Sequence, residues 1–345
     1  MKKSQIISGQ ALIGEDFQIR PVDIIVDSGI IRAIEENPRA PPVWICPSFF
    51  NAHTHLGDTI AMDCGTSGDL AALVTPPDGL KHRLLAQATH AELVNGMKAS
   101  IEGMIARGTS GCADFREGGK DGVTALLEAA AGLPFRTVIF GRDGGEIFGE
   151  GIGISSARDV ADVDRLVEEA RKCGKKVAFH AGERDPDDVD AALQYDPDLI
   201  IHATHATKKQ LKECADRNIP IAVCPRSNWI LGVTGSADYP QLKSMQDLGC
   251  TFFLGTDNVM FVSPDMLSEM AFTSTIYNLE PEVILRAAVG GSVISGTPHF
   301  IRVGARANLF TLDPGHSAIR FSRNPLKSLV RRAEGFSVGK NVFNA

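Results

Sequence analysis

Short apolar segments alternate with helical patterns through the middle of this 345-residue chain. Several of these segments are continuously hydrophobic, as is typical of strands buried on both faces of a parallel sheet. Eight strands that alternate with helices predict an α/β fold with a closed parallel (β/α)8 barrel, the TIM-barrel architecture. The eight predicted strands are residues 43–55, 109–115, 135–141, 152–154, 177–180, 199–202, 219–223 and 251–255.

Helical patterns fill much of the sequence between these strands. One long pattern covers residues 80–107 and stops at Gly108, and an amphipathic pattern covers residues 155–173 and stops at Gly174. Glycine just past the last apolar position is a common helix end, because it adopts the left-handed conformation without strain. Each of the two patterns is therefore predicted to form one helix.

The two ends of the chain have the pattern of a small β unit. Near the N-terminus, strand-like segments are separated by turn residues and followed by a proline-rich step at 38–42. After residue 300 the β character returns, with a predicted turn and strand over residues 302–313. We therefore predict a small β-sandwich domain formed by residues 1–44 and 300–345, and a barrel domain formed by residues 45–299. The N-terminal strand candidates are residues 6–9, 22–29 and 30–34.

Composition and charge indicate a globular protein and argue against several classes of binding partner. A hydrophobic fraction of 43% supports a sizeable core, and a net charge of −7 argues against general nucleic-acid binding, which favours a basic surface. No apolar run reaches the length of a membrane span, and we predict no signal peptide. The seven cysteines are scattered without a Cys-x-x-Cys pair, as expected for reduced thiols in a cytoplasmic protein. We expect a small-molecule substrate and no nucleic-acid or membrane partner, and we leave a homo-oligomer open.

Candidate metal ligands fall at the carboxyl ends of the predicted strands, where a barrel places its active site. His53 and His55 share one face of the first strand, because side chains alternate along a strand. His180 ends the fifth strand, and Asp257 ends the eighth, which closes against the first. Three imidazoles and one carboxylate suit a divalent ion such as zinc or iron.

Each of these residues also has an ordinary structural interpretation. A single histidine at a strand end is more often structural than a ligand, Asp257 could cap the following helix, and His205 could be a plain loop residue. Coincidence of position favours a site, because His202, like the candidate ligands, ends a strand that the barrel needs. Four other histidines do not end a predicted barrel strand, and we interpret them as structural or solvated. They are His82, His90, His299 and His316.

Five motifs resemble those of the amidohydrolase superfamily. The similarity is to the branch of cytosine deaminases, guanine and adenosine-type deaminases and triazine chlorohydrolases. The motifs belong to strands one, five, six, seven and eight of that branch, and their combination is highly specific for the superfamily but much less so for the substrate. They are Asn-Ala-His-Thr-His-Leu at 51–56, His-Ala-Gly-Glu at 180–183, Ile-His-Ala-Thr-His at 201–205, Cys-Pro-Arg-Ser-Asn at 224–228 and Gly-Thr-Asp-Asn at 255–258.

The resemblance extends to both termini and implies a metal site. Segments 23–31 and 303–309 resemble the two halves of the β-sandwich of that family, and 324–330 resembles its tail. Two-metal members carry a carboxylated lysine at the end of the fourth strand. No lysine lies between Arg142 and Arg171, which favours a single ion. We expect one divalent metal ion, Zn²⁺ by preference, with Fe²⁺ or Mn²⁺ as alternatives.

The resemblance also implies roles for the residues around this ion. The ion would be held by His53, His55, His180 and Asp257, and would lower the pKa of water toward neutrality. Glu183 would take a proton from that water and pass it to a ring nitrogen, and Asp257 would accept the second proton. The sixth-strand histidine would donate to the tetrahedral centre. The catalytic residues expected are Glu183, His202 and Asp257.

Three functions are compatible with this set of residues. The first is hydrolytic deamination of an amino-substituted N-heterocycle, such as a purine, pyrimidine or pterin, with release of ammonia. The second uses the same scaffold to hydrolyse a C–N amide bond, either within a ring or in a side group of the substrate. The third is a catalytically inactive barrel that serves as a binding subunit, and the intact ligand set with Glu183 argues against it.

Arginines near the strand ends suggest a feature of the substrate. Arg116, Arg142 and Arg226 follow the second, third and seventh strands, and Arg184 lies beside Glu183. Such arginines often pair with neighbouring acids, but the planar guanidinium also suits a carboxylate or phosphate. We therefore hypothesise an anionic group on the substrate. Other candidate substrate-binding residues are His205, Ser227 and Asn228.

Overall fold

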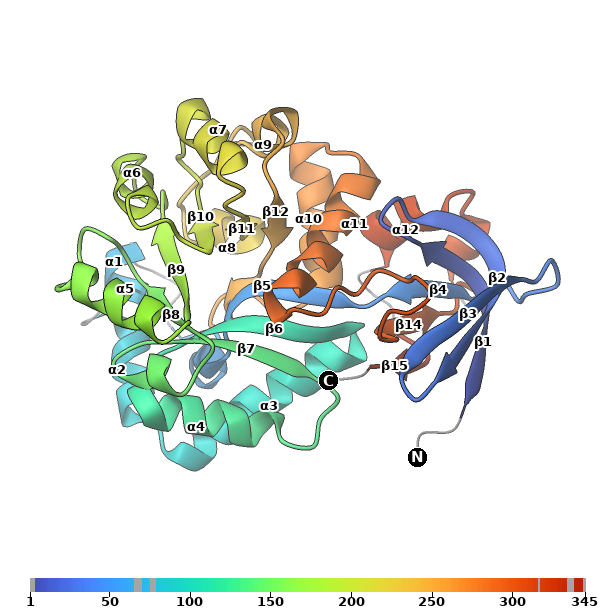
Figure 1. Cartoon of the computed structure of the whole chain (residues 1–345), viewed down its shortest axis with the longest axis horizontal. Helices are drawn as coiled ribbons and strands as arrows, with labels where there is room; N and C mark the ends of the chain where they lie inside the picture. The colour runs from blue at the N-terminus through green and yellow to red at the C-terminus, as the bar shows by residue number, and fades with distance from the viewer. Residues whose placement is uncertain (1–3, 65–69, 75–78, 316, 334–337, 344–345) are drawn as a thin grey trace.

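The computed structural model describes residues 4–64, 70–74, 79–315, 317–333 and 338–343 (Figure 1). The barrel lies at one end of the molecule, and a second sheet built from both termini lies at the other (Figure 1). Among the described residues, no helix combines the length and apolar character that crossing a bilayer requires.

Parallel strands close into a barrel. The described strand segments of this sheet run in the order β12-β11-β10-β9-β8-β7-β6-β5-β13. β12 and β13 are successive pieces of the eighth strand, and β13 pairs in parallel with β5, so the sheet closes on itself. The strands are β5 (Phe49–His55), β6 (Thr109–Arg116), β7 (Arg136–Gly141), β8 (Gly151–Ile154), β9 (Lys176–Ala181), β10 (Leu199–His202), β11 (Ile221–Val223), β12 (Phe252–Leu254) and β13 (Asp257–Asn258).

The join between β12 and β13 depends on a close approach to β5. A Cβ atom on Gly255 would lie 2.8 Å from the Cβ of His53, so only glycine allows the eighth strand to pass this close to the first. The Thr256 amide then donates to the His53 carbonyl at 3.0 Å. The closure therefore fixes His53 and the end of the eighth strand against each other.

Helices cover the outside of the barrel (Figure 1). α5 shows the sequence logic, because Val163, Val167 and Ala170 are spaced to share one face and are the residues that it buries. The helices of this part are η1 (Leu56–Ala61), α1 (Leu70–Val74), α2 (Leu80–Gln87), α3 (His90–Ala106), α4 (Gly119–Ala130), η2 (Gly145–Ile147), α5 (Val163–Lys172), α6 (Asp187–Leu193), α7 (Lys208–Asp216), α8 (Pro225–Ile230), α9 (Leu242–Leu248), α10 (Met266–Tyr277), α11 (Pro281–Gly290) and η3 (Gly291–Ser295).

The second sheet combines segments from both termini in the order β15-β14-β4-β1-β2-β3. β14 pairs antiparallel with β4, and Ile7, Ile24, Ile45 and Leu309 meet in its buried core. The predicted domain boundaries at 44/45 and 299/300 stay a prediction. The elements of this part are β1 (Gln5–Ile13), β2 (Gln18–Asp27), β3 (Ile30–Glu36), β4 (Trp44–Pro47), β14 (Leu309–Leu312), η4 (Ala318–Phe321), α12 (Pro325–Arg332) and β15 (Asn341–Val342).

The segment predicted as one strand over residues 43–55 is two strands in two sheets. β4 belongs to the sheet of the two termini and β5 to the barrel, and they meet at the buried Ser48. The Ser48 amide donates to the Asn308 carbonyl, and its hydroxyl lies 2.7 Å from that of Ser110. The apolar residues on both sides of Ser48 are buried in either sheet, so the sequence pattern does not mark the change.

Two predicted helices also differ from the structure. The pattern over 80–107 divides into α2 and α3, because Thr89 caps α3 in a reciprocal capping box with Glu92. The pattern over 155–173 becomes helical only at Val163. In the turns before it, the Ser156 hydroxyl accepts from the Arg158 amide and donates to Asp188, which replaces the expected helical bonds.

Candidate active site

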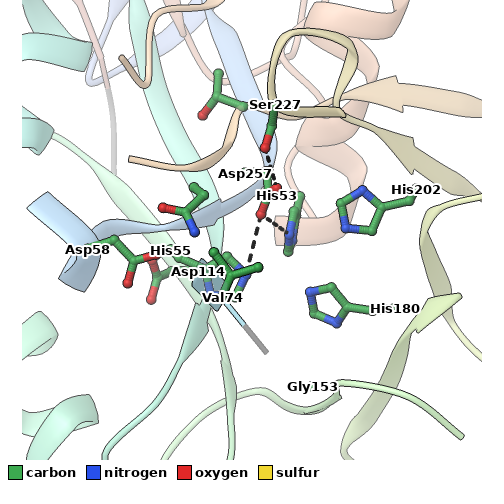
Figure 2. Close-up of polar contacts among 12 residues, drawn as sticks. His53, His55, Asp58, Val74, Asp114, Gly153, His180, His202, Ser227 and Asp257 are labelled. Atoms are coloured by element: carbon green, nitrogen blue, oxygen red, sulfur yellow. Dashed lines mark hydrogen bonds and ion pairs between the residues drawn. The ribbon is translucent and has the colours of Figure 1, made fainter. Parts of the chain in front are cut away.

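Five side chains from the first, fifth, sixth and eighth strands meet at the carboxyl end of the barrel (Figure 2). The imidazole Nε2 atoms of His53 and His55 lie 3.1 and 3.5 Å from Oδ1 of Asp257. The ligand atoms of His53, His55 and Asp257 lie within 4.8 Å of one another, as do those of His53, His180 and His202. The structure thus brings together the four predicted ligands and His202.

The imidazole nitrogens of this cluster are arranged as ligands of a metal ion would be. Nε2 of His180 is buried without a hydrogen-bond partner. Its Nδ1 lies 3.1 Å from the Ile154 carbonyl and 3.2 Å from Nη2 of Arg142, so the unpartnered Nε2 is the nitrogen left for a metal ion. Nδ1 of His55 likewise faces Oε1 of Glu117 at 2.9 Å. An acceptor that holds the far nitrogen of the ring is the usual arrangement of a metal-ligating histidine.

Burial sets the protonation of the candidate ligands. It lowers the pKa of His53 to about 4 and that of His55 to about 3, so both imidazoles are neutral near pH 7. Burial alone would raise the pKa of Asp257, but the hydrogen bond with His53 holds it well below its ordinary value. Neutral imidazoles and an ionised carboxylate are the forms that bind metals.

The backbone is strained where two of these residues leave their strands. His202 has a φ of 73° and Asp257 a φ of 60°, both in the left-handed region that non-glycine residues rarely adopt. The Ser227 hydroxyl donates to Oδ2 of Asp257 at 2.6 Å (Figure 2) and holds its carboxylate in place. Such strain persists where surrounding contacts over-determine the geometry, which is common at active sites.

Glu183 faces the cluster from the loop after β9. Gly182 has a φ of 71°, and a Cβ atom there would lie 2.7 Å from Val189, so the tight turn that presents Glu183 requires glycine. Oε1 of Glu183 lies 3.8 Å from Nε2 of His202. Burial raises the pKa of Glu183, which favours proton uptake by this carboxylate.

His202 is oriented from behind by the seventh-strand motif. Its Nδ1 lies 3.1 Å from Oδ1 of Asn228, and the Asn228 amide nitrogen donates to Thr204 at 2.8 Å. Nε2 of His202 is thereby directed toward Glu183. His205 instead points away, with Nε2 3.1 Å from the Val233 carbonyl.

We predict that His202→Asn lowers kcat about 100- to 1,000-fold, as expected for loss of a group that stabilises developing charge. His205→Asn should change kcat little, because that imidazole contacts a loop carbonyl and does not line the cavity. Steady-state kinetics of both variants checks this. A larger loss at His205 would reverse the two assignments.

A cavity of about 280 Å³ opens above the cluster. This volume is at the lower end of ligand pockets and suits a small molecule. Its lining residues are His55, Val74, Lys81, Arg142, Ser155, Ser156, Asp159, Val160, His180, Glu183, Arg184, Asp188, His202, Asp257 and Asn258.

Known proteins are similar to this chain in fold and in sequence. The chain superposes on the crystal structure of an adenosine deaminase from Xanthomonas campestris with bound zinc, with a TM-score of 0.79 at 17% identity, covering 97% of this chain and 89% of that one. A family model described as adenosine deaminase matches residues 147–299.

Two archaeal relatives, both named "Putative aminohydrolase", decide the family. The protein of Methanothermobacter thermautotrophicus is 30% identical over 96% of this chain and 95% of its own length. The protein of Archaeoglobus fulgidus is 36% identical over 84% of this chain and 83% of its own. The chain belongs to the amidohydrolase superfamily. It is a hydrolase of carbon–nitrogen bonds other than peptide bonds.

The predicted arginines occupy different places in this amidohydrolase. Arg142 and Arg184 line the cavity. Arg116 does not, because it is 2% exposed and its guanidinium lies 3.3 Å from Asp114 and 2.8 Å from Glu117. Arg226 does not line the cavity either, because its guanidinium is bound to the buried Glu269 at 2.6 Å. Ser227 and Asn228 contact Asp257 and His202 from behind rather than from the cavity.

Arg226→Met should destabilise the amidohydrolase by about 3–5 kcal/mol, because it leaves the fully buried carboxylate of Glu269 without its cation. Urea unfolding monitored by circular dichroism measures this. The exposed Arg165, paired with Glu169 on α5, provides the matched control, and Arg165→Met should change stability little. Equal effects in the two variants would contradict the structural role of Arg226.

Sequence analysis missed a buried ionic cluster beside His55. Lys81 is 3% exposed and contacts Asp58 at 3.0 Å and Glu117 at 2.9 Å. Glu117 follows a strand end, which was a usable signal. Lys81 lies in a polar stretch of α2 and carries no sequence feature that distinguishes it from a surface lysine.

Proposed function

We propose that this amidohydrolase removes an amino group from an N-heterocycle by hydrolysis and releases ammonia. The observation that carries the proposal is the position of Glu183. Its carboxyl, with a pKa raised by burial, shares one cavity with His202 and with the cluster of His55, His180 and Asp257. An acid–base group beside a metal-ligand cluster is what hydrolysis of an amino-substituted ring requires.

We propose that one divalent ion, preferably Zn²⁺, with Fe²⁺ or Mn²⁺ as alternatives, is held by His53, His55, His180 and Asp257. The support is the set of unpaired or inward-facing imidazole nitrogens and the ionised carboxylate. When bound, such an ion supplies Lewis acidity that lowers the pKa of water toward neutrality.

The protein's own side chains then divide the proton transfers. Glu183 takes the proton of the attacking water and delivers it to a ring nitrogen of the substrate. His202, held through Nδ1 by Asn228, presents Nε2 to the substrate at the reacting carbon. Asp257, held by Ser227, accepts the second proton of the water. Asp257 passes this proton to the amino group, the carbon–nitrogen bond breaks, and ammonia leaves while the ring carbon keeps the oxygen of the water.

We also propose an anionic group on the substrate, bound by Arg142. Arg142 lines the cavity, and its Nε donates to the Gly153 carbonyl at 2.8 Å, which fixes the guanidinium plane. Its salt bridge to Glu117 is long, at 3.6 Å, so its positive charge is only weakly paired. Arg184 lies at the same wall but is bound to Asp159. A carboxylate or phosphate would complete the pairing of Arg142.

Ammonia release by the zinc-loaded protein tests the proposal. The panel contains aminated nucleobases, nucleosides, nucleotides and pterins, with cyclic amides as a second arm. We expect ammonia from at least one heterocyclic amine and a higher kcat/KM for an anionic form than for its neutral parent. Cleavage of cyclic amides alone would replace deamination by amide hydrolysis, and no turnover of either arm would contradict an enzyme at this site.

Arg142→Met should raise KM for the anionic substrate about 10-fold or more and leave KM for the neutral parent nearly unchanged, as for loss of one charge-assisted contact. The ratio of the two KM values is the measurement. The same change in both substrates would assign Arg142 to the support of His180, whose Nδ1 lies 3.2 Å from Nη2 of Arg142, rather than to the substrate.

A further inference from the structure

Three positively charged or proton-donating groups closely contact the carboxylate of Glu117, and Nη1 of Arg142 lies farther away at 3.6 Å. Oε1 of Glu117 lies 2.9 Å from Nδ1 of His55 and 2.9 Å from Nζ of Lys81. Its Oε2 accepts from Arg116 at 2.8 Å. Apart from that of Arg142, the side chains of these residues are all at most 8% exposed. Glu117 is therefore a fixed, compensated charge rather than a mobile one.

Glu117 distinguishes His55 from the other imidazoles of the cluster. Nδ1 of His180 contacts a backbone carbonyl and Nδ1 of His202 contacts the amide oxygen of Asn228. His55 is the one of these three whose Nδ1 faces a carboxylate. A carboxylate in this position fixes the tautomer and ring orientation and makes the opposite nitrogen a better metal ligand.

Glu117 is not placed to touch the substrate. It does not line the cavity that contains His55, Lys81 and Glu183. Its negative charge is compensated by the salt bridges to Lys81 and Arg116. Any effect of Glu117 on the reaction is therefore transmitted by its neighbours, of which His55 belongs to the proposed metal site.

Lys81 and Arg116 hold Glu117 from two separate elements. Lys81 comes from α2 and also contacts Asp58 of η1 at 3.0 Å, while Arg116 is the last residue of β6. A buried ammonium group is stable only when carboxylates compensate it. The packing of α2 against the barrel thus fixes the carboxylate that faces His55.

We infer that Glu117 is a positioning residue that orients His55 and raises the affinity of the active site for its metal ion. The inference rests on the metal site of the proposed function. It adds a residue that contacts neither the proposed ion nor the substrate, and it links the affinity of the site to the buried charge cluster.

Zinc affinity of the metal-free protein, measured by competition with a chromophoric chelator, tests the inference. Glu117→Gln should weaken Zn²⁺ binding about 10- to 100-fold, the usual effect of removing a group that orients a metal ligand. Glu128→Gln is the matched control, because Glu128 is exposed on α4 and paired with the exposed His90. That variant should bind zinc as the wild type does. Unchanged affinity of Glu117→Gln would overturn the inference.

Glu117→Asp separates positioning from charge and is the safer variant for folding. It keeps the negative charge beside Lys81 and Arg116, but withdraws the carboxylate from His55 by one methylene. We expect a clear loss of zinc affinity with a melting temperature close to that of the wild type. Wild-type affinity in Glu117→Asp would mean that Glu117 acts only as a distant charge, and would overturn the positioning role.

A double-mutant cycle with His55→Ala completes the test. If Glu117 acts through His55, adding Glu117→Gln to His55→Ala should change the remaining zinc affinity by less than about 2-fold. An undiminished loss in that background would overturn the inference alone. A wild-type protein that binds no zinc would instead overturn the proposed metal site together with it, so the two failures are distinguishable.

Discussion

Replacing Glu183 by glutamine will lower kcat about 100- to 10,000-fold and leave the metal content unchanged. The amide has the shape of the carboxylate but cannot carry a proton from water to the substrate. Glu183 lies 3.8 Å from His202 and is not one of the proposed ligands, so its replacement should leave the ligand cluster intact. Steady-state kinetics and elemental analysis of the same preparation measure both quantities.

A matched control for this variant is Glu213→Gln on α7. Glu213 is exposed and forms a surface salt bridge with Arg217. We expect kcat of that variant to equal the wild-type value. Near-normal kcat in Glu183→Gln would mean that another group carries the proton.

The double variant His53→Ala/His55→Ala should lose both the metal and the activity. We expect the content to fall from about one divalent ion per protein molecule to nearly none, because only two of the four proposed ligands remain. Elemental analysis after dialysis against trace zinc measures this. His90→Ala is the control, because His90 is exposed and bound to Glu128. Two ions per wild-type molecule, or an unchanged content in the double variant, would contradict the single site.

The convergence of the site could be read from the sequence because it follows from two local rules. Alternation along a strand puts His53 and His55 on one face, and parallel strands in a barrel bring all of their carboxyl ends to one side. Neither rule needs knowledge of tertiary contacts. The prediction of a fourth strand at residues 152–154 was also correct, since β8 pairs with both β7 and β9.

The sequence could not predict whether a side chain just after a strand end points into the cavity or toward a buried partner. Arg142 and Arg226 look alike in sequence, but the partner of Arg226 is Glu269, 43 residues farther along the sequence. The burial of Lys81 depends on its salt bridges to Asp58 and Glu117, which come from two other parts of the fold. Long-range pairs of buried charges have no periodicity, so only the folded structure assigns these residues.

The change of sheet at Ser48 escaped sequence analysis for a different reason. Hydrophobicity reports that a residue is buried but not which layer buries it. Trp44 pairs with β14 and Phe49 with β6, yet both side chains are buried in the same hydrophobic core cluster. The same limit concealed the break between α2 and α3, where the capping residues Thr89 and Glu92 were the available signal.

The pairing of β13 with β5 also fixes when the site can exist during synthesis. His53 and Asp257 touch in the folded protein but are 204 residues apart in the sequence. At a ribosomal rate of ~5–20 residues per second, Asp257 is synthesised ~10–40 s after His53. During that interval a nascent polypeptide presents two imidazoles without the eighth strand. The complete set of four proposed metal ligands is therefore available only after most of the polypeptide has left the ribosome.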